Sequence, residues 1–359
     1  MRNIIIMAKI KITDLYYQDG PSEGYVNFPK ILELASVPFI FMIGARGIGK
    51  TFGAIDALYT NKWQSIFLRR TQTQADEISV PTLSPVKPVC SWYGVDYKIE
   101  SISKSLKGVT FGDMEEPLMY SGALSTLHNL RGFDASETTH FFYDEFIPQP
   151  NEKPIQHEGE AFLNAYETMN RNRELKGLPP MQFVGMSNSN RLDNPLFMDL
   201  NMVTFCDKLF SKGYCFAIDE NRGFAVINFE DSPISKRKNE TALYKFSRGT
   251  DFAAMALDNE FRDYRTPSKS YPLKALVPMA NVGEITICRV KGVDKGFVIA
   301  HILKAPEKFN NDEKGLAYFY TSGFAKAFWL LYLEENMEFE SYYAESLFKK
   351  YCNNSRKMI

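Results

Sequence analysis

The sequence predicts an α/β fold with a mainly parallel central sheet, and three observations lead to this prediction. An apolar run, Phe39–Ile43, breaks into a glycine-rich turn that ends at Thr51. A second apolar run, Thr139–Tyr143, ends on the adjacent carboxylates Asp144 and Glu145. Helical and strand-like apolar patterns alternate around these segments, as expected where helices connect the strands of one sheet.

Residues Gly44 to Thr51 match G-x-x-x-x-G-K-[ST], the pattern of a phosphate-binding loop. Backbone N–H groups must converge on phosphate oxygens in such a loop, and glycine permits that close approach. We expect Lys50 to reach the β and γ phosphates, Thr51 to hold Mg²⁺, and the helix starting near Lys50 to point its positive end at the nucleotide. A glycine-rich turn without a ligand is the alternative. The nucleotide-binding candidates are Gly44, Ala45, Arg46, Gly47, Ile48, Gly49, Lys50 and Thr51.

The carboxylate pair after the second apolar run forms a Walker-B-like pattern. We expect Asp144 to bind Mg²⁺ through its water shell and Glu145 to polarise the water that attacks the γ-phosphate. A transferase takes its nucleophile from the substrate and needs no second carboxylate, so the pair favours hydrolysis. An acidic turn after an ordinary strand is the alternative.

Two pairs of arginines follow predicted elements. Arg69 and Arg70 end the strand that starts at Ser65, where they could contact nucleotide, contact a neighbouring subunit, or be solvated. Arg171 and Arg173 end the amphipathic helix predicted over Glu158–Arg173. One of these two could reach across a subunit interface as an arginine finger, or both could favour the helix dipole.

Other segments complete the predicted first part of the chain. The strand Met181–Ser187 places Asn188 where it could sense the γ-phosphate or the attacking water, or cap the next turn. Aromatic residues between Lys11 and Ser36 could stack on adenine or pack the sheet edge. The patterns also predict a helix over Ile31–Leu34, a helix over Thr51–Tyr59, a loop over Ser79–Pro88, a hairpin over Tyr97–Phe111 turning at Lys107-Gly108, and strands over Tyr214–Ile218 and Phe224–Phe229.

Composition limits the function classes. The 359 residues carry a formal net charge of −1, so any contact with nucleic acid must come from a local basic surface. The five cysteines are scattered along the sequence, which indicates reduced, packed thiols. Such thiols are typical of a cytosolic protein. We expect no membrane span, since the longest apolar run is too short.

From Pro233 the composition becomes basic, and we expect a small linker domain that could face DNA or merely be solvated. Its basic residues are Lys236, Arg237, Lys238, Lys245, Arg248, Arg262, Arg265, Lys269 and Lys274, and a helix is expected over Ala253–Phe261. Beyond it we expect a β-meander (Leu276–Met279, Ile285–Val290, Phe297–Ile302), an apolar segment Tyr318–Tyr320, and helices over Ser322–Glu335 and Ser341–Tyr351. The meander lacks the three or four clustered carboxylates that a two-metal nuclease needs.

Five motifs together resemble the genome-packaging ATPases of phi29-like tailed phages, over about the first 230 residues. The motifs are GARGIGKT at Gly44–Thr51, FLRR at Phe67–Arg70, FYDEF at Phe142–Phe146, MNRNRE at Met169–Glu174 and SN at Ser187-Asn188. The segment NLRG at Asn129–Gly132 is similar to phage large terminases more broadly.

This resemblance implies an ASCE-type ATPase over residues 1–232, a linker or lid domain over 233–269 and a degenerate RNase H-like domain over 270–359. It further implies ATP and Mg²⁺ as cofactors, double-stranded viral DNA and the prohead portal as partners, a packaging RNA as a further partner, and a homo-oligomeric ring, pentameric in relatives. By the same resemblance Arg171, rather than Arg173, is the trans-acting arginine finger. The expected location is the cytoplasm of an infected bacterium. A large terminase with a working nuclease and another P-loop translocase or helicase are the alternatives.

Overall fold

The computed structural model of the chain describes residues 5–6, 10–130, 133, 135–148, 152, 155, 157–188, 192, 194–210, 214–229, 232–238, 240–247 and 271–352. Two compact units emerge, Met1–Phe261 and Arg262–Ile359, and each is described by itself. The helix expected over Ala253–Phe261 lies outside the described residues, as does part of the segment Asn129–Gly132. The separate linker domain stays a prediction.

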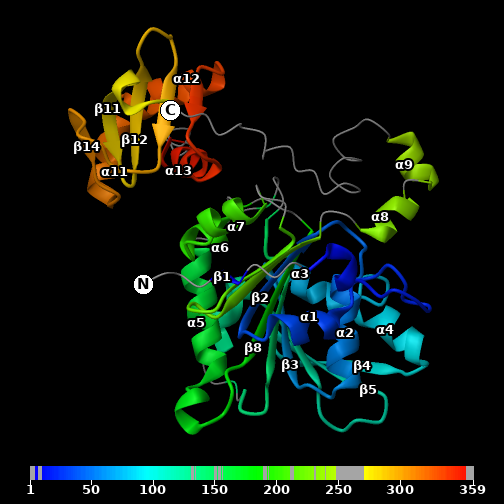
Figure 1. Cartoon of the computed structure of the whole chain (residues 1–359). Coiled ribbons are helices and arrows are strands. Elements are labelled where there is room, and N and C mark those ends of the chain that lie inside the picture. Colours follow the sequence, from blue (N-terminus) through cyan, green and yellow to red (C-terminus); the bar gives the residue numbers. More distant parts are fainter. Residues whose placement is uncertain are drawn as a thin grey trace. The chain divides into compact units, whose positions relative to one another are not determined.

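The first unit is built on a ten-stranded sheet, ordered β1-β9-β10-β2-β8-β7-β3-β6-β5-β4 (Figure 1). Its middle strands β10, β2, β8, β7, β3 and β6 run parallel, which confirms the expected mainly parallel sheet. Antiparallel pairing is confined to the two ends, with β9 and β1 at one and β5 and β4 at the other. The strands are β1 Ile5–Ile6, β2 Phe39–Gly44, β3 Ser65–Arg69, β4 Tyr97–Ser103, β5 Leu106–Phe111, β6 Met119–Ala123, β7 His140–Asp144, β8 Gln182–Ser187, β9 Phe216–Asp219 and β10 Phe224–Phe229.

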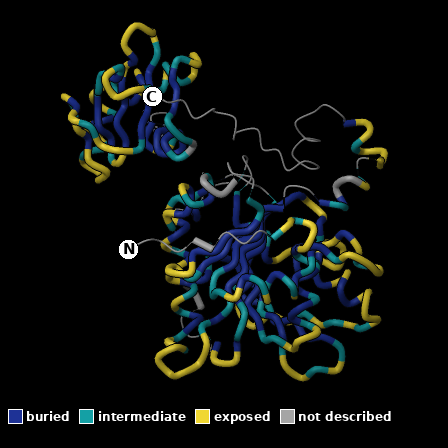
Figure 2. Tube along the Cα trace, in the orientation of Figure 1, coloured by how far each residue is buried: buried dark blue, intermediate teal, exposed yellow. Residues whose placement is uncertain are grey.

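Helices cover both faces of this sheet, so its central strands are buried on both sides (Figure 2). α1, α2 and α4 lie over one face, and α5 and α6 over the other (Figure 1). Side chains alternate along β2: Ile40 and Met42 belong to the core under α1 and α2, whereas the Phe41 ring contacts Phe183 and Phe197. The helices are α1 Phe28–Ala35, α2 Lys50–Thr60, α3 Gln72–Asp76, α4 Val86–Tyr93, α5 Glu158–Asn170, α6 Pro195–Asp199, α7 Val203–Phe210, α8 Pro233–Lys238 and α9 Ala242–Phe246.

One local expectation was wrong in this unit, and another was wrong only in part. The loop predicted over Ser79–Pro88 is present at residues 80–85, but α4 begins at Val86, because Pro88 falls in the first helical turn, where a missing N–H costs nothing. The hairpin turns at Lys104-Ser105 instead of Lys107-Gly108. Gly108 lies inside β5, where a Cβ atom would come within 2.8 Å of the Pro117 ring, so this glycine serves a close approach and not a turn.

The second unit is a five-stranded sheet, ordered β14-β11-β12-β13-β15, with three α-helices among its described residues. Its antiparallel β11, β12 and β13 confirm the expected meander, and α12 and α13 confirm the two expected helices. The elements are β11 Leu276–Val282, β12 Ile285–Val290, β13 Gly296–Ile299, β14 Glu307–Phe309, β15 Met337–Phe339, α11 Glu313–Thr321, α12 Phe324–Leu333 and α13 Tyr342–Cys352.

The apolar segment Tyr318–Tyr320 is helical, within α11. Its helix starts where the Asp312 carboxylate accepts a hydrogen bond from the Gly315 N–H at 2.6 Å, a cap that a short apolar run does not reveal. Among the described residues of the whole chain, no helix has the length and apolar character needed to cross a bilayer.

Candidate nucleotide site

The predicted phosphate loop joins the carboxyl end of β2 to the start of α2. Gly47 (φ 70°) and Gly49 (φ 93°) both take left-handed backbone conformations, which residues with a Cβ atom rarely adopt. Ala45 and Ile48 are fully buried beneath the loop, while Arg46 and Gly47 are exposed at its tip. The strand, turn and helix expected from the motif are therefore all present.

Lys50 lies at the centre of the site and is 5% exposed. Its Nζ donates hydrogen bonds to the carbonyl oxygens of Gly44 and Ala45, both at 2.9 Å, and to Asn188 Oδ1 at 3.1 Å. Burial lowers the pKa of the Lys50 ammonium to about 7, although the nearby carboxylates oppose that shift. An anionic ligand would favour the charged form, as expected for a lysine that binds phosphate.

Thr51 and Asp144 meet although they come from different elements. Thr51 Oγ1, in the first turn of α2, donates to the Asp144 carboxylate with oxygen distances of 3.0 and 3.2 Å. Asp144 ends β7, and its side chain is almost fully buried. A hydroxyl and a carboxylate are oxygen ligands of the kind that Mg²⁺ prefers, so this pair fits the expected metal.

Glu145 follows directly, and its backbone is left-handed with φ 56°. Such a conformation is uncommon for a residue with a side chain and often marks a functional position. Asn188, just after β8, donates from Nδ2 to Glu145 Oε1 at 3.1 Å while its Oδ1 accepts from Lys50. Burial raises the pKa of Glu145, with Arg69 acting against that shift. The amide thus links the phosphate-loop lysine to the predicted base.

Arg69, the last residue of β3, and Arg70, which follows it, are both engaged in ion pairs, so the solvated alternative is wrong for them. Arg69 reaches both carboxylates, with its guanidinium 3.1 Å from Asp144 Oδ2 and 2.9 Å from Glu145 Oε2. The Arg70 side chain is fully buried and forms two hydrogen bonds to Glu158, at the start of α5, of 3.0 and 2.8 Å. Arg69 therefore faces the site, whereas Arg70 fixes the start of α5 through Glu158.

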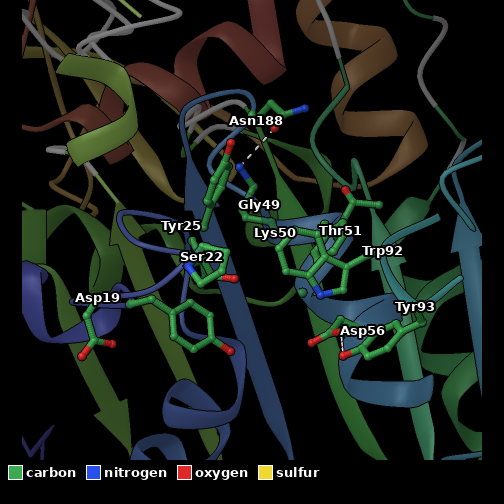
Figure 3. A pocket seen from close by; sticks show the side chains of 16 residues that line it. Asp19, Ser22, Tyr25, Gly49, Lys50, Thr51, Asp56, Trp92, Tyr93 and Asn188 are labelled. Atoms are coloured by element: carbon green, nitrogen blue, oxygen red, sulfur yellow. Dashed lines mark hydrogen bonds between the residues drawn. The ribbon is translucent and has the colours of Figure 1, made fainter. Parts of the chain in front are cut away.

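A pocket of about 810 Å³ opens beside the loop. Figure 3 shows Tyr25 on one side of Lys50 and Trp92 on the other, and the Tyr93 hydroxyl, from α4, donates a hydrogen bond of 2.6 Å to Asp56, on α2. Tyr25 belongs to the aromatic segment that was expected to offer a ring to adenine. Trp92 and Tyr93 were missed, because no element was predicted over residues 89–96.

Arg171 and Arg173 lie near the amino ends of the parallel strands, opposite the phosphate loop. Arg171 caps α5 with a left-handed backbone (φ 43°), and its guanidinium donates to the Phe133 carbonyl. Arg173 donates to the carbonyls of Pro179, Ser136 and Thr138. These carbonyls precede β7 or β8, whereas the phosphate loop follows the carboxyl end of the parallel β2. A strand of five residues, such as β7, spans roughly 17 Å between its amino and carboxyl ends. Neither arginine therefore reaches the candidate site of its own subunit.

Carboxylates of the second unit are paired instead of clustered. Glu338, on β15, accepts from the Tyr271 hydroxyl and from Lys295 Nζ, both at 2.7 Å. Glu340 accepts from the Ala300 N–H at 3.0 Å, and Glu284 from the Tyr343 hydroxyl at 2.9 Å. Across the part of the chain that the structure describes, no group of three or more His, Cys, Asp or Glu side chains could hold a metal ion.

Comparison with known proteins gives three consistent findings. The family model described as Podovirus DNA encapsidation protein (Gp16) matches residues 23–266. The "DNA packaging protein" of Bacillus phage phi29 and that of Bacillus phage PZA are each 27% identical over 228 residues, which is 62% of this chain and 61% of each relative. The match therefore spans less than two thirds of these relatives.

Solved structures of similar fold cover nearly the whole chain. "The Phi-28 gp11 DNA packaging Motor" aligns with a TM-score of 0.60 at 18% identity, over 92% of this chain and 97% of that one. "The bacteriophage Phi-29 viral genome packaging motor assembly" aligns with a TM-score of 0.59 at 17% identity, over 91% of this chain and 99% of that one. With the family model matching well over half of the sequence, the chain belongs to the podovirus DNA encapsidation protein (Gp16) family.

Proposed function

We propose that this chain is an ATP-hydrolysing motor that moves double-stranded viral DNA into a preformed prohead. The observation that carries the proposal is the single network of Lys50, Thr51, Asp144, Glu145 and Asn188, drawn from three separate segments to the carboxyl ends of the parallel strands. Family membership and the names of the relatives support the DNA-packaging part. ATP supplies the phosphoanhydride bond whose hydrolysis releases the free energy.

Each residue of the network has a role in this proposal. Lys50 and the N–H groups of the loop bind the phosphates, and Thr51 and Asp144 hold Mg²⁺. Glu145 accepts a proton from the attacking water, and its raised pKa brings it closer to the working pH of a general base. Asn188 holds the Glu145 carboxylate through the hydrogen bond at 3.1 Å. Arg171 acts on the site of a neighbouring subunit.

The wider assembly is also part of the proposal. We infer an ASCE-type ATPase that works as a homo-oligomeric ring, a pentamer as in the family resemblance, docked on the portal with a packaging RNA in the host cytoplasm. The second unit would be a nuclease-inactive RNase H-like docking module. Among the described residues no three His, Cys, Asp or Glu side chains come together to hold a metal ion, and this supports the proposed inactivity, since a two-metal nuclease needs such a cluster.

Replacing Glu145 with Gln tests the proposal. The amide cannot accept the proton, so turnover should fall by about 10² to 10⁴-fold while Mg-ATP affinity stays nearly intact. Phosphate release and isothermal titration measure the two quantities. Lys50→Ala should instead lose affinity, and Glu33→Gln, at an exposed ion pair on α1, is the matched control.

DNA transport is measured as nuclease protection of DNA inside proheads that carry the cognate portal. Glu145→Gln should protect no DNA, and Glu33→Gln should protect as much as the unmodified chain. Normal hydrolysis by Glu145→Gln would overturn the assignment of the base. Hydrolysis without any DNA protection by the unmodified chain would leave an ATPase that is not a packaging motor.

A further inference from the structure

Helix α8 (Pro233–Lys238) belongs to the segment that the sequence assigns to a basic linker, yet it packs on the nucleotide site. Ile234 is 7% exposed, and Gly24 is in such close contact that a Cβ atom there would lie 3.2 Å from the Pro233 Cβ. Arg237 forms an ion pair of 2.8 Å with Glu23. The segment around Glu23 is itself joined to the phosphate loop, because the Val26 N–H donates to the Ile48 carbonyl at 2.9 Å.

Lys238, the last residue of α8, reaches the tip of the phosphate loop. Its Nζ donates a hydrogen bond to the carbonyl oxygen of Arg46. A Cβ atom on Gly47 would lie only 2.5 Å from this Nζ, so the glycine leaves the space that the ammonium occupies. The position is specific to Lys238, since Arg237 turns to Glu23 instead.

The site therefore gathers more positive charge than the loop motif alone supplies. Lys238 and Arg46 both act to lower the pKa of Lys50, which means that the three cationic groups are near enough to repel one another. Burial also lowers the pKa of Lys238. Asp144 and Glu145 are engaged with Arg69. A polyphosphate bound to the loop would supply the negative charge that these three cations lack. It would approach Lys238 through the exposed tip of the loop at Gly47.

We propose that Lys238 is a phosphate-contacting residue of the nucleotide site, delivered from α8 to the terminal phosphates of ATP. The proposal rests on the proposed function, because it takes the ligand of the loop to be a nucleoside triphosphate. It assigns Lys238 to nucleotide binding and removes it from the set of linker residues expected to face DNA.

A series of nucleotides that differ only in phosphate number tests this contact. Mg-ATP, Mg-ADP and AMP are titrated against the full chain and against Lys238→Ala, Lys238→Arg and Arg237→Ala. Lys238→Ala should weaken ATP binding about tenfold or more, ADP binding less, and AMP binding not at all, as expected for the loss of a charged hydrogen bond to the distal phosphates. Lys238→Arg should restore most of the ATP affinity.

Arg237→Ala is the matched control, because it changes the neighbouring cation of the same helix and should leave all three affinities unchanged. Equal weakening of ATP and AMP by Lys238→Ala would overturn the proposal, since it would mean that Lys238 only steadies the loop. Unchanged ATP affinity would overturn it as well. If the unmodified chain and Lys50→Ala bind ATP equally poorly, the proposed function itself fails, and that result is distinct from the other two.

Discussion

The sheets of the two units place their carboxylates in opposite situations. In the first unit Asp144 and Glu145 follow a parallel strand and lie beside Lys50 and Thr51, which line a large pocket. In the second unit Glu338 lies within a short strand and is held by a lysine and a tyrosine. From this difference we expect a sheet carboxylate to take part in chemistry where its neighbours also line a pocket.

The largest effect is expected from a substitution in the first unit that acts on the candidate site of a neighbouring subunit. If Arg171 completes the neighbour's site, Arg171→Ala should lower ATPase activity by about 10³ to 10⁵-fold, the range for arginine fingers generally. Mixing Arg171→Ala with Glu145→Gln should restore activity above either protein alone, because some interfaces then combine an intact Arg171 with an intact Glu145. Phosphate release by the assembled mixture measures the recovery.

Arg173→Ala is the control, since Arg173 is held by three backbone carbonyls near the same helix end. It should lower stability without any complementation pattern. Mixed rings that form but show no recovery would mean that Arg171 only caps α5. Recovery with Arg173→Ala in place of Arg171→Ala would transfer the finger to Arg173.

A smaller effect is expected from His140, at the start of β7. Its ring stacks on Trp63 with centroids 3.8 Å apart, and burial lowers its pKa to about 4, below the usual value near 6.5. The unfolded chain therefore takes up this proton first as the pH falls, and stability is lost between about pH 6.5 and pH 4. His140→Phe should remove about 2 kcal/mol of the loss measured between pH 7.5 and pH 5. Urea unfolding at both pH values checks this, and identical losses in the two proteins would contradict it.

The smallest effects are expected in the second unit, and they sharpen the comparison. The full chain with Mg²⁺ or Mn²⁺ should leave supercoiled plasmid uncut. Glu338→Gln should change ATPase activity little and lower the free energy of unfolding by less than about 1 kcal/mol, since its partner Lys295 is about one third exposed. Metal-dependent nicking that disappears with Glu338→Gln would restore the terminase alternative. Gel analysis of the plasmid reports this outcome.

Much of the candidate nucleotide site could be predicted from the sequence, because each motif carries its own geometry. The loop of Gly44–Thr51 requires a strand before it and a helix after it, and carboxyl ends of parallel strands share one edge, which brings Asp144 beside Thr51. Asn188 was placed correctly at this edge by the same rule, although its bridging of Lys50 and Glu145 depends on side-chain directions that no pattern encodes.

Features that depend on contacts between distant segments could not be predicted. Gly108 resembles a turn residue until Pro117 is found packed against it. The strands β14 and β15 have three residues each, too few for alternation to be recognised. Lys238 looked like one member of a basic stretch, and only the fold places it on the Arg46 carbonyl.

The separation of Arg171 from the phosphate loop has a consequence for symmetry. If Arg171 is the arginine finger, each subunit presents the finger at the amino ends of its parallel strands and the site at their carboxyl ends, so one contact between subunits uses two different surfaces. Such head-to-tail association is heterologous, and it yields a closed ring when the rotation per subunit divides a full turn, or a helical filament when it does not. In a closed ring every finger has a site to complete, whereas an open filament always leaves one unpaired finger and one incomplete site at its ends.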